Sequence, residues 1–469
     1  MTYLTTIGLE VHAELNTKSK MFCGCKNEPH GSEPNANICP VCMAHPGTLP
    51  VPNEQAIEMV LLFGQAVGAK PADFSEFDRK NYFYPDIPKA YQISQYAFPF
   101  LSGGQLEGVE LTRVHLEEDT ARSQHDKGKG SVVDFNRAGV PLMELVTEPV
   151  IHDAKTAGNF ARELQLILRT LGISHANMEK GEMRVEANIS VSREVGVFGT
   201  KVEVKNLNSF KSVESAIDYE VNRQIECLEN GKELSQETRG WDEVKLRTFS
   251  QRSKETAKDY RYFPDPDIPK IMVSKHEAFS TSRLNEKMPK LPNETREYYQ
   301  NLGLTSNTVE VLLANIELDT FLKKVLNLSK GNEVAKLSAN YLTSDLLPIL
   351  SEEVYRLEDL NPAHFNELMV MVEESKVGSR VAKDLLPELF NSSKTPLQIA
   401  TDKNLLQVSD VSSLKATIDE IIAENPTVVE EYRGGKEASL KFLLGQGMKK
   451  TKGSADPKAL EQLLIDSLK

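Results

Sequence analysis

The 469-residue sequence predicts an α+β fold, in which a domain with a mostly antiparallel sheet precedes an all-helical domain and a small helical tail domain. Two observations predict this fold class. Up to about residue 290, short segments alternate apolar and polar residues with period two, as strands with one solvent-accessible face do. Beyond that point, apolar residues recur at the spacing of amphipathic helices. We therefore expect domains at 1–292, 293–403 and 404–469.

The first predicted strand carries the most informative pattern in the chain. Between Ile7 and Leu15 the odd positions are apolar, and the even positions from 10 onward are Glu10, His12 and Glu14. Glutamate is a poor strand former, so two carboxylates and an imidazole on one face of a strand favour a functional reason. A hard divalent cation with one nitrogen ligand is such a reason.

The other predicted elements follow along the chain. Period two recurs in the segments 183–191 and 201–205, and helical patterns span 53–68, 152–172 and 209–230. After residue 293, Asn-Pro and Thr-Pro dipeptides begin or end successive helices.

Four of the five cysteines lie within twenty residues, at Cys23, Cys25, Cys39 and Cys42. Clustered cysteines in a chain without secretory features indicate a metal before a disulfide, and four thiolates complete a tetrahedral Zn²⁺ site. The first pair is spaced C-x-C rather than C-x-x-C, and the alternative is four reduced thiols in a loop. Cys227 falls in a helical pattern and is expected to fill the core.

Composition limits the compartment and the partners. No apolar run approaches the roughly 18 residues of a membrane span, and residues 1–4 lack signal-peptide features, so we expect a cytoplasmic protein. A net charge of −13 excludes nucleic-acid binding over the whole surface. The tail nevertheless holds a basic patch, for which a solvated helix face is the simpler interpretation. Its residues are Arg433, Lys436, Lys441, Lys449, Lys450, Lys452 and Lys458.

Further acidic residues accompany the predicted strands. Three consecutive acids, from Glu117 to Asp119, follow an alternating segment, and Glu144 stands among apolar neighbours, where an unpaired carboxylate is costly. Each acid alone is more often structural than functional. Taken together, they suit Mg²⁺ or Mn²⁺ rather than Zn²⁺. The predicted set is Glu10, His12, Glu118, Glu144 and Glu186.

Lysines and aromatic residues are interleaved with these acids. Lys80 opens an aromatic run that continues to Lys89, and Lys205 ends a predicted strand; lysines beside Mg²⁺ suit phosphate binding. Segments 81–89 and 260–270 share an aromatic-Pro-Asp pattern, so we expect two similar turns around one cavity. The sequence has neither a phosphate-loop motif nor a G-x-S-x-G nucleophile motif, so any ATP is bound without a P-loop.

Several long motifs occur in the order found in one known family. The chain resembles the B subunits of the tRNA-dependent amidotransferases over essentially its whole length. The matching motifs are 8–12, 77–86, 89–94, 115–119, 203–210, 236–239, 259–265 and 442–446.

The resemblance implies an activity and partners. It implies a catalytic cradle domain that phosphorylates the side-chain carboxylate of Glu-tRNA(Gln) or Asp-tRNA(Asn) with ATP, before ammonia displaces phosphate. It further implies a heterotrimer, in which an amidase partner (the A subunit) supplies ammonia from glutamine and a small third protein (the C subunit) joins the pair. The tail at 404–469 is implied to bind tRNA, which favours a functional basic patch.

The resemblance also assigns residues. His12, Glu118 and Glu144 are implied to bind Mg²⁺, and Glu10 and Glu186 to complete the site or hold a second metal. Lys80 is implied on the phosphate side, and the cysteines as a zinc loop. No motif of the family reaches Glu14, which we expect to be solvated.

Two alternatives remain open. One is a non-catalytic scaffold that positions tRNA within the same complex. The other is a metal- or carboxylate-dependent hydrolase with Glu10 and Glu144 as an acid/base pair. The sequence does not say which tRNA is served, how ammonia travels, or whether a larger synthetase complex forms.

Overall fold

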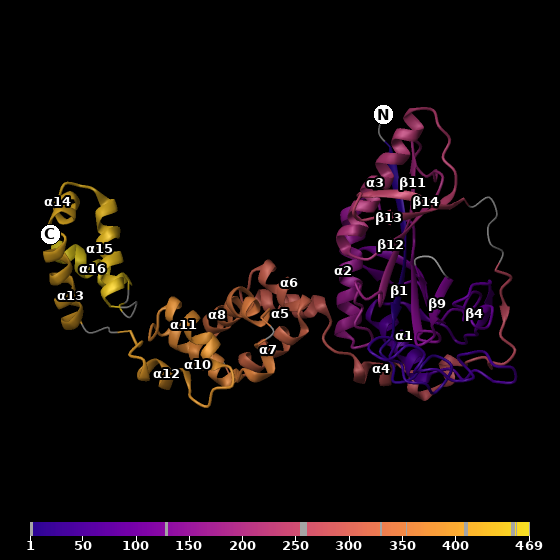
Figure 1. Cartoon of the computed structure of the whole chain (residues 1–469), viewed down its shortest axis with the longest axis horizontal. Helices are drawn as coiled ribbons and strands as arrows, with labels where there is room; N and C mark the ends of the chain where they lie inside the picture. Colours follow the sequence, from indigo (N-terminus) through magenta and orange to yellow (C-terminus); the bar gives the residue numbers. More distant parts are fainter. Residues whose placement is uncertain are drawn as a thin grey trace. The chain divides into compact units, whose positions relative to one another are not determined.

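The computed structural model describes residues 3–126, 130–253, 260–328, 331–352, 354–407, 411–451, 455 and 457–468. The chain divides into two compact units, Met1–Pro292 and Asn293–Lys469 (Figure 1). All strands of the described residues belong to the first unit, and the second is helical. The predicted α+β class is therefore confirmed.

A ten-stranded sheet forms the centre of the first unit, with β1 (Leu4–Glu14) among its inner strands. The strand order is β14-β13-β12-β11-β1-β10-β7-β5-β2, with β6 paired to β7. Among the described strands, β12 and β13 form the one parallel pair of this sheet, so it is mostly antiparallel, as predicted. The other bounds are β2 Lys70–Pro71, β5 Leu101–Ser102, β6 Gln105–Leu106, β7 Val109–Glu118, β10 Pro141–Thr147, β11 Met183–Ser192, β12 Val202–Leu207, β13 Glu237–Asp242 and β14 Arg247–Ser253.

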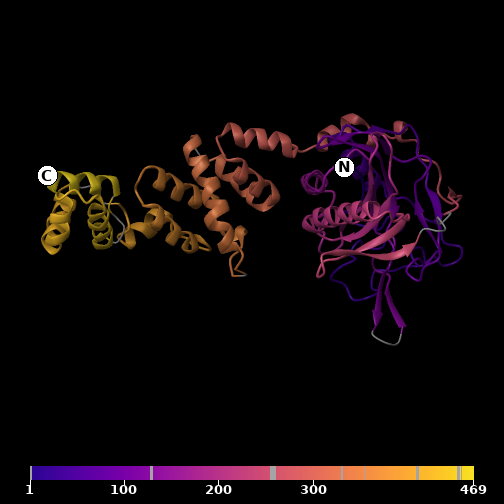
Figure 2. The same ribbon diagram turned by 90° about the horizontal axis from the view of Figure 1, so that it is seen from above.

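Three helices cover the apolar face of this sheet: α1 (Glu54–Ala66), α2 (Ala154–Thr170) and α3 (Phe210–Glu229) (labelled in Figure 1; the same ribbon is turned in Figure 2). They pack there because strand alternation sends the odd residues of β1 into the core; Ile7 and Ala13 are 0% exposed. Side chains at the N-caps of all three helices accept backbone hydrogen bonds, which fixes where the helices begin. The predicted helices and strands are confirmed to within a few residues.

A smaller sheet flanks the other, polar face. It has the order β15-β3-β4, with β15 at Phe263–Pro264, β3 at Asp78–Asn81 and β4 at Tyr91–Ser94. The amide of Gln92 donates to the backbone oxygen of Glu118 at 2.7 Å, which fixes β4 beside β7. A separate hairpin joins β8 (Arg122–Asp126) to β9 (Gly130–Asp134).

The helix α4 (Thr281–Lys287) ends the first unit, and the second unit contains only helices among its described regular elements. Helices α13 to α16 enclose an apolar core that includes Leu414, Ile418, Leu443 and Leu460. No helix of the described residues is long and apolar enough to cross a membrane. The bounds are α5 Pro292–Asn301, α6 Ser306–Ala314, α7 Ile316–Leu326, α8 Asn332–Tyr341, α9 Leu347–Leu350, α10 Pro362–Glu373, α11 Ser379–Leu385, α12 Pro396–Asp402, α13 Val411–Glu424, α14 Pro426–Arg433, α15 Glu437–Lys450 and α16 Pro457–Leu468.

Candidate functional site

Four neighbouring strands align polar side chains across the face of the main sheet that α1 to α3 leave uncovered. In the antiparallel register, His12 of β1 lies opposite Glu144 of β10 on one side and Arg184 of β11 on the other. Glu144 in turn lies opposite His115 of β7. Directly opposed residues share a face of the sheet, so these four side chains form one row.

A second row runs parallel to the first, two residues further along each strand. It consists of Arg113, Val146, Glu10 and Glu186. Lys205 of β12 continues it, because its ammonium lies 2.6 Å from a carboxylate oxygen of Glu186. Acidic residues thus occupy the middle of the face, and cations stand at its edges.

The carboxylates converge on the imidazole of His12. Its Nε2 lies 3.3 Å from Oε2 of Glu144, 3.7 Å from Oε1 of Glu117 and 3.9 Å from Oε1 of Glu10. On the far side, Nε2 of His115 lies 3.2 Å from the same oxygen of Glu144. Ligand atoms of Glu10, His12 and Glu144 all fall within 4.8 Å of one another, close enough to share one cation.

Burial makes this cluster suitable for a hard divalent cation. Glu117 and Glu144 are 2% and 5% exposed. Oε2 of Glu117 makes no hydrogen bond within the described residues, although the ammonium of Lys80 lies 3.9 Å away. Buried carboxylates that converge repel one another unless cations or a metal neutralise them, and carboxylate oxygens with one imidazole suit Mg²⁺ or Mn²⁺.

The protonation of the cluster reflects burial and charge together. Burial disfavours the imidazolium of His12, but the carboxylates of Glu144, Glu117 and Glu186 together outweigh burial and raise the pKa of His12 to about 9. Burial also opposes ionisation of Glu144, yet His115 and His12 hold the pKa of its carboxyl well below the usual range. Burial, followed by the Glu144 carboxylate, raises the pKa of Glu10. A bound divalent cation would neutralise these carboxylates in place of the protons.

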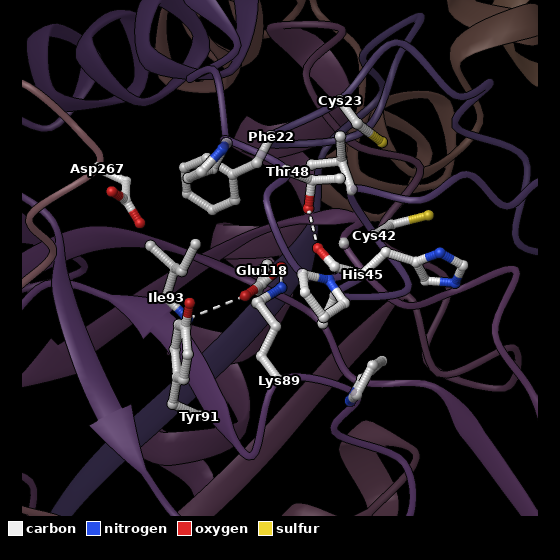
Figure 3. A pocket seen from close by; sticks show the side chains of 16 residues that line it. Phe22, Cys23, Cys42, His45, Thr48, Lys89, Tyr91, Ile93, Glu118 and Asp267 are labelled. Atoms are coloured by element: carbon white, nitrogen blue, oxygen red, sulfur yellow. Dashed lines mark hydrogen bonds and ion pairs between the residues drawn. The ribbon is translucent and has the colours of Figure 1, made fainter.

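The structure corrects the predicted ligand Glu118. It points to the opposite face of β7 from His12, where Oε1 accepts from the backbone N–H of Ile93 at 3.0 Å and Oε2 from Lys89 at 2.7 Å (Figure 3). Strand alternation separates it from Glu117, which shares the face of His115. Glu117 therefore occupies the position expected for Glu118.

The predicted lysines fall in two places. Lys80 lies beside Glu117, and Lys205 pairs with Glu186 and, at 3.4 Å, with Glu203. Lys89, in contrast, lies in a separate cavity of about 280 Å³ that Glu118, Cys23 and Cys42 also line (Figure 3). Lys89 is therefore not next to His12, contrary to its expected place at the cofactor site.

A cavity of about 820 Å³ opens over the cluster. Four tyrosines from two distant segments line it, at Tyr82, Tyr84, Tyr260 and Tyr262. The segments are joined where the N–H of Asn81 donates to the carbonyl of Tyr260 at 2.9 Å, so the two similar aromatic turns do border one cavity. Residues outside the predicted site set also line it, namely Arg113, Glu117, Asp119, Arg184, Lys201 and Glu203.

Glu14 shares the face of His12 but is only 6% exposed, which corrects the expectation of a solvated side chain. Its Oε2 lies 3.8 Å from Nε2 of His30, and burial raises the pKa of its carboxyl. His30 lies in a loop outside the predicted strands, so the sequence pattern gave no indication that it would lie beside Glu14.

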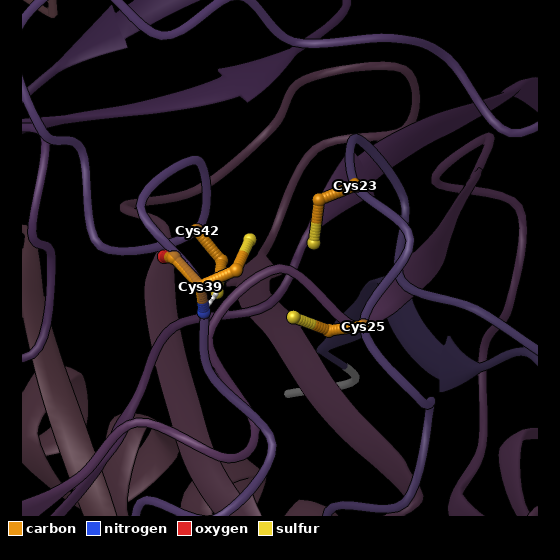
Figure 4. Close-up of side chains that lie close together, drawn as sticks. All are labelled: Cys23, Cys25, Cys39 and Cys42. Atoms are coloured by element: carbon orange, nitrogen blue, oxygen red, sulfur yellow. Dashed lines mark hydrogen bonds between the residues drawn. The ribbon is translucent and has the colours of Figure 1, made fainter.

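The four clustered cysteines converge as a zinc site requires. Their sulfur atoms all lie within 4.8 Å of one another (Figure 4). The backbone N–H of Cys39 donates to the sulfur of Cys42 at 3.1 Å, and the fully buried Lys20 lies 3.9 Å from that sulfur. These donors suit a thiolate, so the set fits tetrahedral Zn²⁺. Cys227 is half-buried near Arg223 rather than in the core, which corrects its expected place.

Part of the predicted basic patch of the tail is neutralised by neighbours. Lys436 pairs with Glu431, Lys450 pairs with Glu420 and Glu424, and Arg433 donates to the carbonyl of Leu468. Lys441 and Lys449 are exposed. The predicted tRNA-binding residue Lys452 and the side chain of Lys458 lie outside the described residues.

Comparisons with known proteins agree across the chain. A family model described as GatB/GatE catalytic domain matches residues 5–278, and one described as GatB domain matches 320–468. A relative from Crocosphaera subtropica, named as the B subunit of an aspartyl/glutamyl-tRNA(Asn/Gln) amidotransferase, is 42% identical over 98% of this chain and 97% of its own length. A relative of the same name from Thermodesulfovibrio yellowstonii is 42% identical over 100% of both chains.

Proposed function

Because this chain belongs to the family of aspartyl/glutamyl-tRNA(Asn/Gln) amidotransferase B subunits, we propose that its cavity activates a side-chain carboxylate with ATP. The enzyme is a ligase that forms a C–N bond and converts misacylated Glu-tRNA(Gln) or Asp-tRNA(Asn) into Gln-tRNA(Gln) or Asn-tRNA(Asn). This membership leaves the hydrolase alternative without support.

The reaction has a chemical difficulty that the cavity addresses. A carboxylate does not react with ammonia, because its leaving group would be oxide. Transfer of the γ-phosphoryl group of ATP to a carboxylate oxygen gives an acyl phosphate, and ammonia then displaces inorganic phosphate. The cavity must therefore hold several anionic groups together, which is consistent with its interleaved acids and cations.

The central cluster provides the ligands for a metal. Glu10, His12, Glu117 and Glu144 would hold Mg²⁺, and His115 would orient Glu144 through the contact of 3.2 Å. Mg²⁺ would neutralise phosphate charge and reduce the repulsion between ATP and the carboxylate. Lys80 contributes positive charge beside Glu117. Glu186 is engaged by Lys205, so we assign it an outer position rather than direct ligation.

The observation that carries this proposal is the convergence of three carboxylates on Nε2 of His12, between 3.3 and 3.9 Å. The test is phosphate release from ATP in the presence of Glu-tRNA(Gln) by the reconstituted complex. His12→Ala should abolish release, whereas His175→Ala, which changes an exposed histidine outside the cavity, should leave it unchanged.

The scaffold alternative makes a different prediction for the same assay. If this chain only positioned tRNA, His12→Ala would leave phosphate release intact as long as tRNA still bound. Release at the wild-type rate by a folded His12→Ala complex would therefore replace the catalytic proposal with the scaffold.

We also propose roles for the remaining parts. An amidase partner would supply ammonia, and a small third protein would complete the heterotrimer in the cytoplasm. The cysteines would bind a structural Zn²⁺, residues 293–403 would form a helical domain, and the tail at 404–469 would bind tRNA. Assays with each misacylated tRNA would decide whether one or both are substrates.

A further inference from the structure

Arg113 lines the cavity but is not among the residues proposed to bind the metal. It lies on β7, two residues before His115 and four before Glu117, so alternation places all three on one face of the strand. The antiparallel register sets it opposite Val146, in the same row as Glu10. Its side chain lines the cavity of about 820 Å³.

The other cations near the acids already have partners. Lys80 lies 3.9 Å from Glu117, Arg184 lies 3.2 Å from Asp119, and Lys205 lies 2.6 Å from Glu186. Arg113, in contrast, makes no ion pair with any carboxylate of the described residues. Its Nε is buried and has no hydrogen-bond partner there.

An unpaired buried guanidinium donor is costly, because it has lost water without gaining an acceptor. Such a group persists when its partner is supplied by a ligand. The ligand is anionic, since guanidinium presents a planar fork of donors that matches a carboxylate or a phosphate with two parallel hydrogen bonds. A lysine at this position would present only a point charge.

The distance from the metal cluster suits such a ligand. His115 contacts Glu144 at 3.2 Å, and Arg113 lies two residues further along the same strand. At about 3.3 Å per residue, the two positions are separated by roughly 7 Å. An extended arginine side chain spans that separation, so one oxyanion can contact both a cation at the cluster and the guanidinium.

We propose that Arg113 binds the oxyanion that reacts in this cavity, either the γ-phosphoryl group of ATP or the side-chain carboxylate of the aminoacyl group. The proposal rests on the proposed function. During transfer, the bond between the γ-phosphorus and its bridging oxygen to ADP breaks, and a bond to the carboxylate oxygen forms. Arg113 exchanges no proton; it holds the oxyanion and stabilises its negative charge.

The test compares Arg113→Gln and Arg113→Lys with wild type in the reconstituted complex. Because one oxyanion donor contributes about 100-fold or more, Arg113→Gln should lower kcat/KM for amidation by about that factor. Arg113→Lys keeps the charge but loses the fork, and should lose about tenfold. Mn²⁺ binding and the glutaminase activity of the complex should remain at wild-type values.

The KM values for ATP and for Glu-tRNA(Gln) show which of the two oxyanions Arg113 binds. A phosphate contact raises the KM for ATP or lowers kcat, and leaves the KM for Glu-tRNA(Gln) unchanged. A carboxylate contact raises the KM for Glu-tRNA(Gln), while the affinity for uncharged tRNA stays the same. Either pattern supports the proposal.

Lys70 provides a matched control, since it is an exposed cation of the same sheet that does not line the cavity. Lys70→Gln should keep amidation within about threefold of wild type, as expected for a solvated charge. An equal loss in Lys70→Gln and Arg113→Gln would overturn the proposal in favour of a general field effect. Loss of Mn²⁺ binding in Arg113→Gln would overturn it in favour of a structural role.

The outcome also distinguishes this inference from the proposed function. If wild type releases no phosphate that depends on ATP and Glu-tRNA(Gln), the proposed function fails. If wild type does so and Arg113→Gln matches it, the inference about Arg113 alone fails. Should Arg113→Gln not fold, Arg113→Lys decides, and a wild-type rate in that variant overturns the proposal.

Discussion

Glu117 and Glu118 are adjacent on β7 but serve opposite faces of the sheet. Oε1 of Glu117 lies 3.7 Å from Nε2 of His12, whereas Oε2 of Glu118 accepts from Lys89 at 2.7 Å in a different cavity. Both are nearly fully buried, so each carboxylate depends on its own partner. Of the two carboxylates, only that of Glu117 is therefore in position to share a metal with His12, whereas Glu118 belongs to the cavity that Lys89 lines.

Glu117→Gln and Glu118→Gln should therefore differ in metal binding. Glu117→Gln removes a ligand charge beside His12 and should weaken Mn²⁺ binding by at least about tenfold, a loss that even outer-shell changes produce. Glu118→Gln should bind Mn²⁺ like wild type. Calorimetric titration of both proteins with Mn²⁺ checks this. The reverse order of affinities would restore Glu118 as the ligand.

Zinc removal should loosen the segment that contains Cys23, Cys25, Cys39 and Cys42. Because the metal would close a loop that has few strands of its own, Cys39→Ser or a strong chelator should lower the Tm of the first unit. Metal analysis of the purified protein should find one zinc per chain. Cys227→Ser, outside the cluster, should keep both zinc and Tm. A zinc-free protein with wild-type stability would contradict the assignment.

Two glycines of α15 should respond oppositely to alanine. A Cβ at Gly447 would lie 2.6 Å from Cδ2 of the fully buried Leu460, so Gly447→Ala should cost about 1–3 kcal/mol through overpacking. A Cβ at Gly445 meets nothing within 4 Å among the described atoms, and Gly445→Ala should stabilise the exposed helix position by about 0.5–1 kcal/mol. Hydrogen exchange in α15 measures both changes. Equal effects would contradict this packing.

Exposed lysines of the tail should contribute to tRNA affinity. Lys441→Gln combined with Lys449→Gln should weaken binding of tRNA and lower the slope of log affinity against log salt by about one per lost phosphate contact. Lys403→Gln is the matched control, because Lys403 already pairs with Glu388. Fluorescence anisotropy across a salt series gives the slopes. Unchanged affinity and slope in the double variant would assign the patch to a solvated face.

Several strands of the first unit could be predicted from the period-two alternation of apolar and polar residues. The alternation in β1 and β11 predicted strands with one apolar face, and helical patterns predicted the helices α1 to α3. The same alternation also indicates that Glu117 faces the cavity. Val114 and Leu116 are buried in the core, so His115 and Glu117 must share the other face. Arg113 belongs to this face by the same reasoning.

The rest of the site depends on contacts that local patterns do not encode. In β7 the buried positions change from Val109 and Leu111 to Val114 and Leu116, and a register shift beside Val146 and Thr147 accompanies the change. An uninterrupted period-two pattern therefore assigns part of this strand to the wrong face of the sheet. The contact of His30 with Glu14 and the contact of Lys89 with Glu118 also depend on loops, because His30 and Lys89 are loop residues whose positions follow from tertiary packing.

Phosphorylation of the substrate carboxylate in the His12 cavity leaves a chemical trace in the released phosphate. Glu-tRNA(Gln) labelled with ¹⁸O in the side-chain carboxylate reveals it in the reconstituted complex with ATP and glutamine. An acyl phosphate transfers one labelled oxygen to the released phosphate, so wild type should yield phosphate carrying ¹⁸O, and His12→Ala should yield none. Phosphate free of ¹⁸O from an amidating wild-type complex would rule out activation by phosphorylation.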